Sequence, residues 1–485
     1  MTLKSFRIIS VLSLLLAAAG CSRSLTLTVT DQVINPHYLG NGVEWDPYDE
    51  AISWGAALTD AQWDTLYSRL DFMKPQYVRC MINSPFTYFT GTGFDDERNA
   101  EAIVKLLSYC QSRGVMVVYG EYNPPTWEMK GSQEWVEASV RHLNWLVEEK
   151  GFDCIRHFVI FNEPDGDWAS TNGDFPFWKE MVERFQAEMD RYPALKSVSI
   201  AGPDAVIDYH NKASAYDFNG WLEATVAEVP QVGIYDMHAY PGQRYVRSGE
   251  FEKTLKRLKE KVDKPVILGE AGYKYFSDPA DDALAKEYRK RVEGHPFTKG
   301  SDCNMLVYDD FYALDMPLLL ISVMNAGFSG AAAWMLDDSM HSNGDSGRTE
   351  DIKLWGMWNI LGGTVFGDPS QEDVRPWYYT WSLMCRHFPA GSRIVKLEGK
   401  MPRGVAGTAA VLPDGSVSVL IGTGGSIPLL CLEGFHDLRG TTQDEAGFSG
   451  AGGVQTAKAS RKQSSLSGKE SAQGCIPHRL LGRPD

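Results

Sequence analysis

The strongest constraint on the fold is an eightfold alternation of short apolar runs with amphipathic stretches between about Leu39 and His387. This pattern is typical of buried parallel strands joined by crossover helices. The expected strands are Leu39–Trp45, Tyr77–Met81, Val115–Gly120, His157–Phe161, Val198–Gly202, Ile234–His238, Val266–Gly269 and Ala331–Met335. Because eight such units in one run favour a closed barrel over an open sheet, the sequence predicts an α/β fold with a (β/α)₈ TIM barrel at residues 35–390.

The expected helices begin at recognisable capping residues. Thr59 precedes a helical stretch, Ala61–Met73, in which apolar residues recur every three or four positions. Ser132 precedes a second such stretch, Gln133–Lys150. Ser and Thr side chains satisfy the free N–H groups of a first helical turn, so both positions indicate helix starts.

A small β-domain is expected beside the barrel. Residues 391–424 contain three runs that are typical of antiparallel strands, and one earlier run alternates in the same way. The runs are Leu25–Val33, Arg393–Glu398, Val405–Leu412 and Ser416–Ile421. The turn residues Pro413-Asp414-Gly415 separate the last two. The sequence therefore predicts a small and incomplete C-terminal β-domain that is joined by the N-terminal strand.

The last residues, 425–485, differ in character from the rest of the chain. Ser, Gly, Ala and Gln dominate there, periodicity is lost, and no Trp or Tyr follows Trp381. One interpretation is a disordered tail. We favour a second, a frameshift or assembly error in the coding sequence, because the strand pattern stops abruptly inside Val417–Gly422. Such a truncated β-domain would carry an unpaired edge strand.

Residues 1–21 are predicted to be a signal peptide. Lys4 and Arg7 form a basic start, and the apolar run Ile8–Ala19 is too short for a convincing membrane span. The run ends in Ala18-Ala19-Gly20-Cys21, which resembles the lipobox of bacterial lipoproteins. The resemblance implies a lipidated Cys21 and export to the outer membrane or cell surface, with the periplasm or secretion as alternatives. The lipid anchor is then the only expected contact with a membrane.

Charge and cysteine content exclude some classes of partner and cofactor. The formal net charge of −16 argues against nucleic acid as a partner. Five cysteines within the expected barrel have no zinc-site spacing and are expected to be buried free thiols: Cys80, Cys110, Cys154, Cys303 and Cys385. The pairs Asp309-Asp310 and Asp337-Asp338 suit Ca²⁺, but solvated loop carboxylates are the preferred interpretation. No cofactor and no metal is expected.

Two expected strands end in a glutamate. The fourth runs into Asn162-Glu163-Pro164, and the seventh runs into Glu270. Catalytic side chains of TIM barrels lie at the C-terminal strand ends, and strands four and seven lie across the barrel mouth from each other. Glycoside cleavage needs two such carboxyl groups, one as acid and one as nucleophile or base. Glu44 and Glu121 are the rival candidates for the second carboxylate.

The Asn-Glu-Pro motif together with the strand-seven glutamate resembles glycoside hydrolase clan A, and families 5, 30 and 39 in particular. The resemblance extends over about residues 39–387. It implies that Glu163 is the acid/base, that Glu270 is the nucleophile, that Asn162 holds the sugar 2-OH, and that the anomeric configuration is retained. Phe161 stands where a Trp often precedes the motif, so the family and the sugar stay open.

The same resemblance assigns roles to four further residues. Arg79, at the end of strand two, matches the clan's cation beside the nucleophile; the alternative is a salt bridge at the barrel rim. His238 and Tyr240 match the clan's His-x-Tyr after strand six; the alternative for the histidine is a packed structural residue. Trp334, on strand eight, matches the floor of the −1 subsite; the alternative is core filling.

Two more segments are candidates for sugar binding. Asn123 and Trp127 follow strand three in a segment that resembles one in families 30 and 39 near the −1 sugar. Glu44 and Trp45 end strand one and are expected to bind a sugar hydroxyl and a sugar ring.

The sequence therefore predicts a retaining glycoside hydrolase that cleaves β-linked glycans or oligosaccharides. The alternative is a non-catalytic, surface glycan-binding lipoprotein on a TIM-barrel scaffold. The presence of both Glu163 and Glu270 argues against this alternative, because binding alone requires neither.

Overall fold

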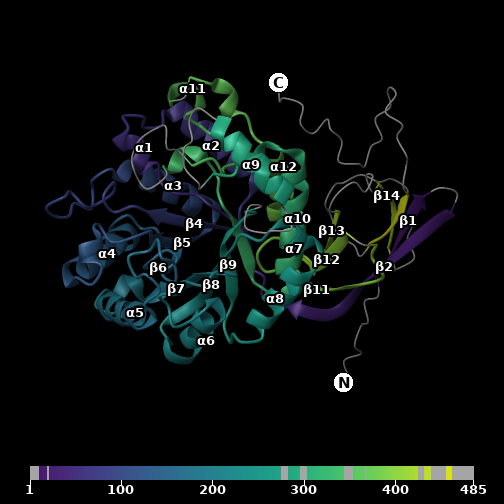
Figure 1. Cartoon of the computed structure of the whole chain (residues 1–485), viewed down its shortest axis with the longest axis horizontal. Helices are drawn as coiled ribbons and strands as arrows, with labels where there is room; N and C mark the ends of the chain where they lie inside the picture. Colours follow the sequence, from purple (N-terminus) through teal and green to yellow (C-terminus); the bar gives the residue numbers. More distant parts are fainter. Residues whose placement is uncertain are drawn as a thin grey trace.

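The structure, a computed structural model, describes residues 10–18, 21–274, 282–294, 303–342, 353–365, 367–402, 404–423, 431–437 and 455–460. A barrel surrounded by helices forms one part of the molecule, and a sheet at its side forms the other (Figure 1). The predicted α/β fold with a TIM barrel and an additional β-domain is confirmed.

The barrel contains eight parallel strands in the closed order β10-β3-β4-β5-β6-β7-β8-β9. They are β3 (Gly40–Glu44), β4 (Tyr77–Ile82), β5 (Met116–Glu121), β6 (Ile155–Val159), β7 (Ser199–Val206), β8 (Val232–Ala239), β9 (Val266–Ala271) and β10 (Gly330–Ala333). Each predicted barrel strand overlaps one of them, and the largest difference is at β7, which extends beyond the expected end at Gly202. Strands four and seven of the barrel are therefore β6 and β9.

Helices surround the barrel on its outer face (Figure 1). They are α1 (Asp49–Ser53), α2 (Asp60–Met73), α3 (Ala100–Arg113), α4 (Gln133–Asn144), α5 (Phe175–Met189), α6 (Phe218–Glu228), α7 (Gln243–Arg247), α8 (Glu250–Lys259), α9 (Asp282–Gly294), α10 (Asp310–Ala326), α11 (Gly362–Val365) and α12 (Pro376–His387). Among the described residues, none of these helices combines the length and the apolar character needed to cross a bilayer.

Both predicted capping residues are found at helix starts. The Thr59 hydroxyl accepts the backbone N–H of Gln62, whose side chain in turn accepts the N–H of Thr59. The Ser132 hydroxyl accepts the N–H of Trp135. The expected helix Gln133–Lys150 is α-helical only to Asn144, and its last turn, Trp145–Glu149, is a π-helix.

The β-domain is a seven-stranded sheet in the order β13-β12-β11-β2-β1-β15-β14. Its strands are β1 (Ser10–Ala18), β2 (Cys21–Asn35), β11 (Arg393–Glu398), β12 (Val405–Val411), β13 (Val417–Thr423), β14 (Cys431–Asp437) and β15 (Gln455–Ser460). As predicted, the N-terminal strand joins the post-barrel strands, because β2 pairs with β11. The other residues of 425–485, and residues 1–9 of the expected signal peptide, lie outside the described residues.

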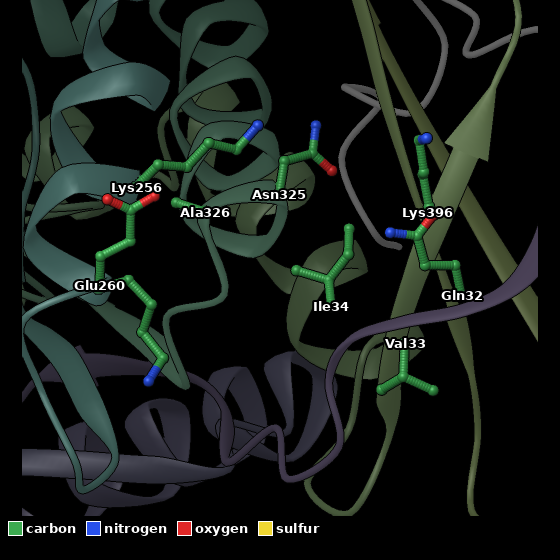
Figure 2. Close-up of a pocket in the computed structure, with 9 residues that line it drawn as sticks. Gln32, Val33, Ile34, Lys256, Glu260, Asn325, Ala326 and Lys396 are labelled. Carbon is green, nitrogen blue, oxygen red and sulfur yellow. The ribbon is translucent and has the colours of Figure 1, made fainter.

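A cavity of about 520 Å³ separates part of the sheet from the barrel (Figure 2). Its lining residues come from β2, from α8 and the residue that follows it, from α10 and from β11: Gln32, Val33, Ile34, Lys256, Lys259, Glu260, Asn325, Ala326 and Lys396. Ile34 precedes β3 and Ala326 precedes β10, so the cavity lies near the N-terminal ends of the barrel strands. Catalytic residues of TIM barrels lie at the other end.

The predicted free thiols are confirmed for the cysteines of the barrel. Cys80, Cys110, Cys154, Cys303 and Cys385 are free and buried. Burial raises the pKa of the Cys154 thiol to about 12, which leaves it un-ionised and unreactive at neutral pH.

Candidate active site

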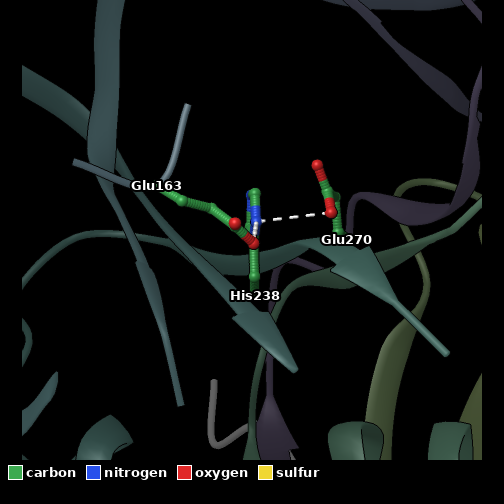
Figure 3. A group of neighbouring side chains, drawn as sticks. All are labelled: Glu163, His238 and Glu270. Carbon is green, nitrogen blue, oxygen red and sulfur yellow. Dashed lines mark hydrogen bonds and ion pairs between the residues drawn. The ribbon is translucent and has the colours of Figure 1, made fainter. Parts of the chain in front are cut away.

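Glu163 and Glu270 meet over the mouth of the barrel. Glu163 follows β6, Glu270 lies in β9, and His238 of β8 stands between them (Figure 3). Nδ1 of His238 is 2.9 Å from Oε1 of Glu163 and 3.5 Å from Oε2 of Glu270. One carboxylate oxygen of Glu163 lies within 4.8 Å of one of Glu270. The structure therefore brings together the two glutamates on which the sequence analysis depended.

The backbone at Glu163 turns sharply at the end of the strand. Glu163 has a φ of 47°, in the left-handed region that non-glycine residues seldom occupy. Its carbonyl oxygen accepts the N–H of Gly166 at 2.9 Å, which closes a tight turn. Residues in such conformations are concentrated at functional sites, where the surrounding structure holds them.

Arg79 is the centre of the charged network. Its guanidinium is fully buried and donates from Nη1 to Glu44 at 2.9 Å and to Glu270 at 2.8 Å. From Nη2 it donates to Asn162 Oδ1 at 2.8 Å and to Asp204 Oδ2 at 2.9 Å. Arg79 thus contacts the nucleophile candidate directly. Its role is not limited to a salt bridge at the barrel rim.

Asp204 is a site residue that the sequence analysis missed. It lies in β7 with a φ of 63° and accepts from Arg79, from His238 Nε2 at 3.1 Å and from the backbone N–H of Glu163 at 3.4 Å. Burial opposes its ionisation, but His238 and Arg79 outweigh burial and lower the pKa of Asp204 to about 2. The rule that selected Glu163 could have found it, had the fifth strand been extended beyond Gly202.

His238 is held as a cation. Both ring nitrogens lie within hydrogen-bonding distance of carboxylate oxygens, those of Glu163 and Asp204. Burial lowers the pKa of His238, but Asp204 and Glu270 outweigh burial and raise it well above its ordinary value. The groupings Glu163–His238–Glu270 and Asp204–Asp236–His238 have the donor types of a metal site.

Glu270 is surrounded by Arg79, His238 and the hydroxyl group of Tyr240. Burial raises the pKa of its carboxyl group, whereas His238 and Arg79 act in the opposite direction and favour the carboxylate. The hydroxyl of Tyr240 donates to Oε2 of Glu270. The structure therefore places Tyr240, a candidate site residue of the sequence analysis, in contact with the strand-seven glutamate.

Trp168 is a second site residue that the sequence analysis missed. Its indole Nε1 donates to Oε2 of Glu163 at 2.7 Å, and the residue is 44% exposed. Trp168 lies in the loop between β6 and α5, where no periodic pattern marks individual residues. Only its position five residues after the motif glutamate could have drawn attention to it.

Glu44 belongs to the network, but Trp45 does not. Glu44 is fully buried and bound to Arg79; burial raises its pKa well above the ordinary value, although Arg79 acts against this shift. Trp45 is also fully buried, and its ring packs edge-on against Tyr109 of α3 at 5.6 Å. The structure therefore places Trp45 in the layer between strand and helix, away from the two glutamates.

Trp334 forms part of the wall beside the network. It follows β10, is 4% exposed, and stacks against His341 with ring centroids 5.8 Å apart and ring planes 5° apart. His341 Nε2 is 2.5 Å from Asp46 Oδ2, and Nδ1 is 3.4 Å from Glu50. Burial lowers the pKa of His341, but Asp46 and Glu50 outweigh it and raise the pKa to about 10, so a cation lies against one face of Trp334.

Asn123 and Trp127 lie in the loop after β5 and differ in exposure. Trp127 is 54% exposed, while Asn123 is partly buried and its backbone carbonyl accepts from Ser84 Oγ at 3.4 Å. The described hydrogen bonds of Glu163 and Glu270 include neither residue. Their predicted role in sugar binding stays a prediction.

The loop aspartates that suited Ca²⁺ have other partners. Asp337 accepts from Trp358 Nε1 at 2.7 Å and from the N–H of Ile360 at 3.1 Å. Asp338 is bound to the Arg375 guanidinium. Both aspartates are fully buried, so the expectation of solvated carboxylates is wrong for this pair. They fix the loop after β10 instead.

Solved structures of glycoside hydrolases share this fold. An endo-β1,6-glucanase is 14% identical over 85% of this chain and 91% of its own, with a TM-score of 0.56. A glucosidase from Croceicoccus marinus is 13% identical over 85% and 78%, with a TM-score of 0.53. A family 30 subfamily 8 xylanase from Clostridium acetobutylicum is 14% identical over 91% and 93%, with a TM-score of 0.52. The predicted resemblance to clan A is confirmed at the level of the fold.

The comparisons of sequence found no match for this chain: no protein family model and no curated protein matches it. At 13–14% identity the structural likeness shows the fold alone, so the chemistry is argued from the site.

Proposed function

We propose that the chain is a retaining glycoside hydrolase that cleaves β-linked glycans or oligosaccharides, with Glu163 as acid/base and Glu270 as nucleophile. The observation that carries the proposal is that one carboxylate oxygen of Glu163 lies within 4.8 Å of one of Glu270. Retaining enzymes hold the two carboxyl groups about 5–5.5 Å apart, whereas inverting enzymes leave about 6.5–9.5 Å for a water molecule. The observed approach supports retention.

In the first step, Glu270 attacks the anomeric carbon while Glu163 protonates the departing oxygen. Arg79 donates to Oε1 of the Glu270 carboxylate and Tyr240 donates to Oε2, so each oxygen has a fixed partner. These donors and His238 favour the ionised form that a nucleophile requires, against the effect of burial. The bond from Glu270 to the sugar forms as the bond to the leaving oxygen breaks.

In the second step, Glu163 acts as a base. It removes a proton from water, which attacks the anomeric carbon and releases Glu270. Glu163 is less buried than Glu270, with 13% of its side chain exposed against 5%, so water has better access to it. The imidazolium of His238 lies beside both carboxylates and stabilises the negative charge as it passes from one to the other.

Polar groups near the nucleophile suit a sugar ring. Asn162 binds Arg79 through its amide oxygen, which directs its amide nitrogen to donate, as the 2-OH contact implied by clan A requires. His341 stacks against Trp334, which stays the candidate floor for the sugar. Glu44, Asn123 and Trp127 stay further candidates for sugar contacts.

The place of action is proposed from the N-terminal segment. Cys21 is the predicted lipidation site, which makes the chain an exported lipoprotein anchored by its lipid. Radiolabelled palmitate should enter the wild-type chain in a bacterial host and be absent from Cys21→Ala. Equal labelling of both proteins would contradict the anchor.

The function is tested by sugar release from a broad panel of β-glycans and aryl β-glycosides. Wild type should release sugar, and Glu270→Ala should release none. With an activated aryl β-glycoside and added azide, Glu270→Ala should give the inverted glycosyl azide, because azide occupies the place of the nucleophile. Glu163→Ala should give the retained product, because its covalent intermediate still forms. These opposite stereochemical outcomes would separate the two roles.

One outcome would refute the proposed function. If folded wild-type protein releases nothing from the panel, hydrolysis is refuted for these substrates. Binding of the same glycans, measured by calorimetry, would then favour the non-catalytic alternative.

A further inference from the structure

We infer that Trp168 is a positioning residue for Glu163, and that the exposed part of its indole forms the surface that receives the leaving-group sugar. The inference rests on the proposed function, because it takes Glu163 as the acid/base. It assigns a role to a loop residue that carries no recognised motif.

The first observation is the way in which the Glu163 carboxylate is held. The indole Nε1 of Trp168 donates to Oε2 at 2.7 Å, and Nδ1 of His238 lies 2.9 Å from Oε1. Each oxygen therefore has a fixed partner, and the carboxylate plane is set by two groups from different parts of the chain. Hydrogen bonds to an ionised acceptor are about twice as strong as those between neutral groups. Removing one donor frees the carboxylate to rotate.

The second observation is a glycine that allows the indole to reach Glu163. A Cβ atom on Gly166 would lie 2.4 Å from the Trp168 ring, closer than any real contact. The same glycine donates its N–H to the Glu163 carbonyl at 2.9 Å. The loop thus folds back upon itself, and the Trp168 ring lies over Gly166 with its N–H directed at the carboxylate.

The third observation is the exposure and support of the ring. Trp168 is 44% exposed, although its polar atom is bonded within the site. The ring of Tyr209, which follows β7, packs against it with centroids 4.6 Å apart at 51°. An apolar ring that is supported and yet open to solvent is suited to the apolar face of a sugar. Because the acid/base protonates the oxygen of the leaving group, a surface beside Glu163 lies on the leaving-group side.

The environment of Glu163 defines what the loss of the indole N–H should do. His238 of β8, Asp204 of β7, Glu270 of β9 and Asp165 of its own loop are the ionisable groups that act on it. Trp168 adds a neutral donor to these charges. Without this donor, one oxygen of the Glu163 carboxylate loses its fixed partner.

The positioning role is tested without any substrate. In protein labelled with ¹⁵N-tryptophan, the indole N–H signal of Trp168 is the one missing from Trp168→Phe. In Glu163→Gln this signal should move from its wild-type position, because the indole N–H no longer donates to a carboxylate. A Trp168 signal that is unaffected by Glu163→Gln would overturn the positioning role.

Kinetics then separate the N–H from the ring. Trp168→Phe keeps an aromatic ring but loses the N–H, so KM for the glycan should stay within about twofold while kcat for the glycan falls. Trp168→Ala loses both features, and its KM for the glycan should rise at least about tenfold. An aryl glycoside with a good leaving group needs little protonation, so kcat for it should fall less in Trp168→Phe than kcat for the glycan.

The experiment also needs a control variant at the surface and a statement of the results that would contradict the proposal. Leu314→Ala changes a residue that is 46% exposed on α10 and should leave both kinetic constants unchanged. Equal KM values for Trp168→Ala and wild type would overturn the leaving-group surface. If wild type cleaves nothing while the Trp168 signal moves in Glu163→Gln, the proposed function and the leaving-group surface fail but the positioning role stands.

Discussion

Two buried glutamates at the mouth of this barrel have very different surroundings. Glu121 ends β5 and accepts from neutral donors, among them Tyr88, Trp135 and Ser139. Glu270 lies at the end of β9 and is bound by Arg79 and Tyr240, with His238 beside it. Burial raises the pKa of both carboxyl groups, and in both cases bonded partners act against it.

The difference lies in the direction of the side chain and in the charge of its partners. Glu121 is bonded to residues of α4 and of the loop after β4, so it ties the barrel to its helical layer. Glu270 is tied to other strands across the mouth, next to Glu163. A carboxylate at a strand end is therefore not in itself catalytic. It becomes a candidate when a second carboxylate and fixed cations lie beside it.

The largest expected effect separates the two glutamates by activity. Glu270→Gln should lower kcat/KM at least about 10⁴-fold, since an amide cannot act as the nucleophile. Glu121→Gln should retain kcat/KM within about threefold, because Glu121 faces the helical layer. Both are measured with the best substrate of the panel. A comparable loss in both variants would remove the distinction.

Loss of the Arg79 cation should have the next largest effect, a decrease in the free energy of unfolding. Arg79→Met leaves Glu44, Asp204 and Glu270 without their shared partner and should lower the free energy of unfolding by about 3–5 kcal/mol. Urea unfolding followed by circular dichroism measures this change. Arg113→Met, which breaks an exposed ion pair with Asp71, should change stability far less, because solvent screens that pair. Equal changes would show that the network contributes no more than a surface pair.

The pH dependence of stability should carry the signature of Asp204. Its pKa falls from 3.8 to about 2 in the folded chain, and one pKa unit corresponds to about 1.4 kcal/mol. The contribution of about 2 kcal/mol is fully present above pH 4 and is lost as the pH falls through 2. Unfolding titrations between pH 5 and pH 2 should show a shallower loss in Asp204→Asn than in wild type. Parallel curves would contradict the depressed pKa.

The smallest expected effect is the decrease in stability when Glu121 is replaced by Gln. In Glu121→Gln one oxygen acceptor becomes an N–H₂ donor, which must face either Trp135 or the hydroxyl donors. The mismatch should lower the free energy of unfolding by about 1–3 kcal/mol. Thermal unfolding measures it, and an unchanged midpoint would show that the cluster reorganises without cost. This result would sharpen the contrast with Glu270, whose main effect is on activity.

Much of this arrangement was predictable from local patterns. Periodic apolar runs located the barrel strands, because parallel strands buried on both faces must be apolar. The ends of these runs placed Glu163, Glu270, Arg79 and His238 at the same end of the barrel. Topology then required strands four and seven to face each other. None of these steps needed knowledge of side-chain packing.

Other residues were assigned to the site only by their neighbours in the sequence. Trp45 adjoins Glu44, but successive residues of a strand point to opposite faces, and Trp45 packs against Tyr109 instead.

Trp168 was missed because a loop has no period from which the direction of a side chain can be read. Asp204 was missed because β7 continues beyond its apolar run.

The sequence by itself determined the order of strands and helices and the two carboxylates at the barrel mouth, since these follow from residue periodicity and chain order. The tertiary structure alone decided which carboxylates share Arg79 and His238, that Glu121 belongs to the helical layer, and that Trp168 reaches Glu163. These facts depend on side-chain directions and on contacts between segments far apart in the chain. The charge and hydrogen-bonding environment of a carboxylate is set by such contacts, and the local sequence does not record them.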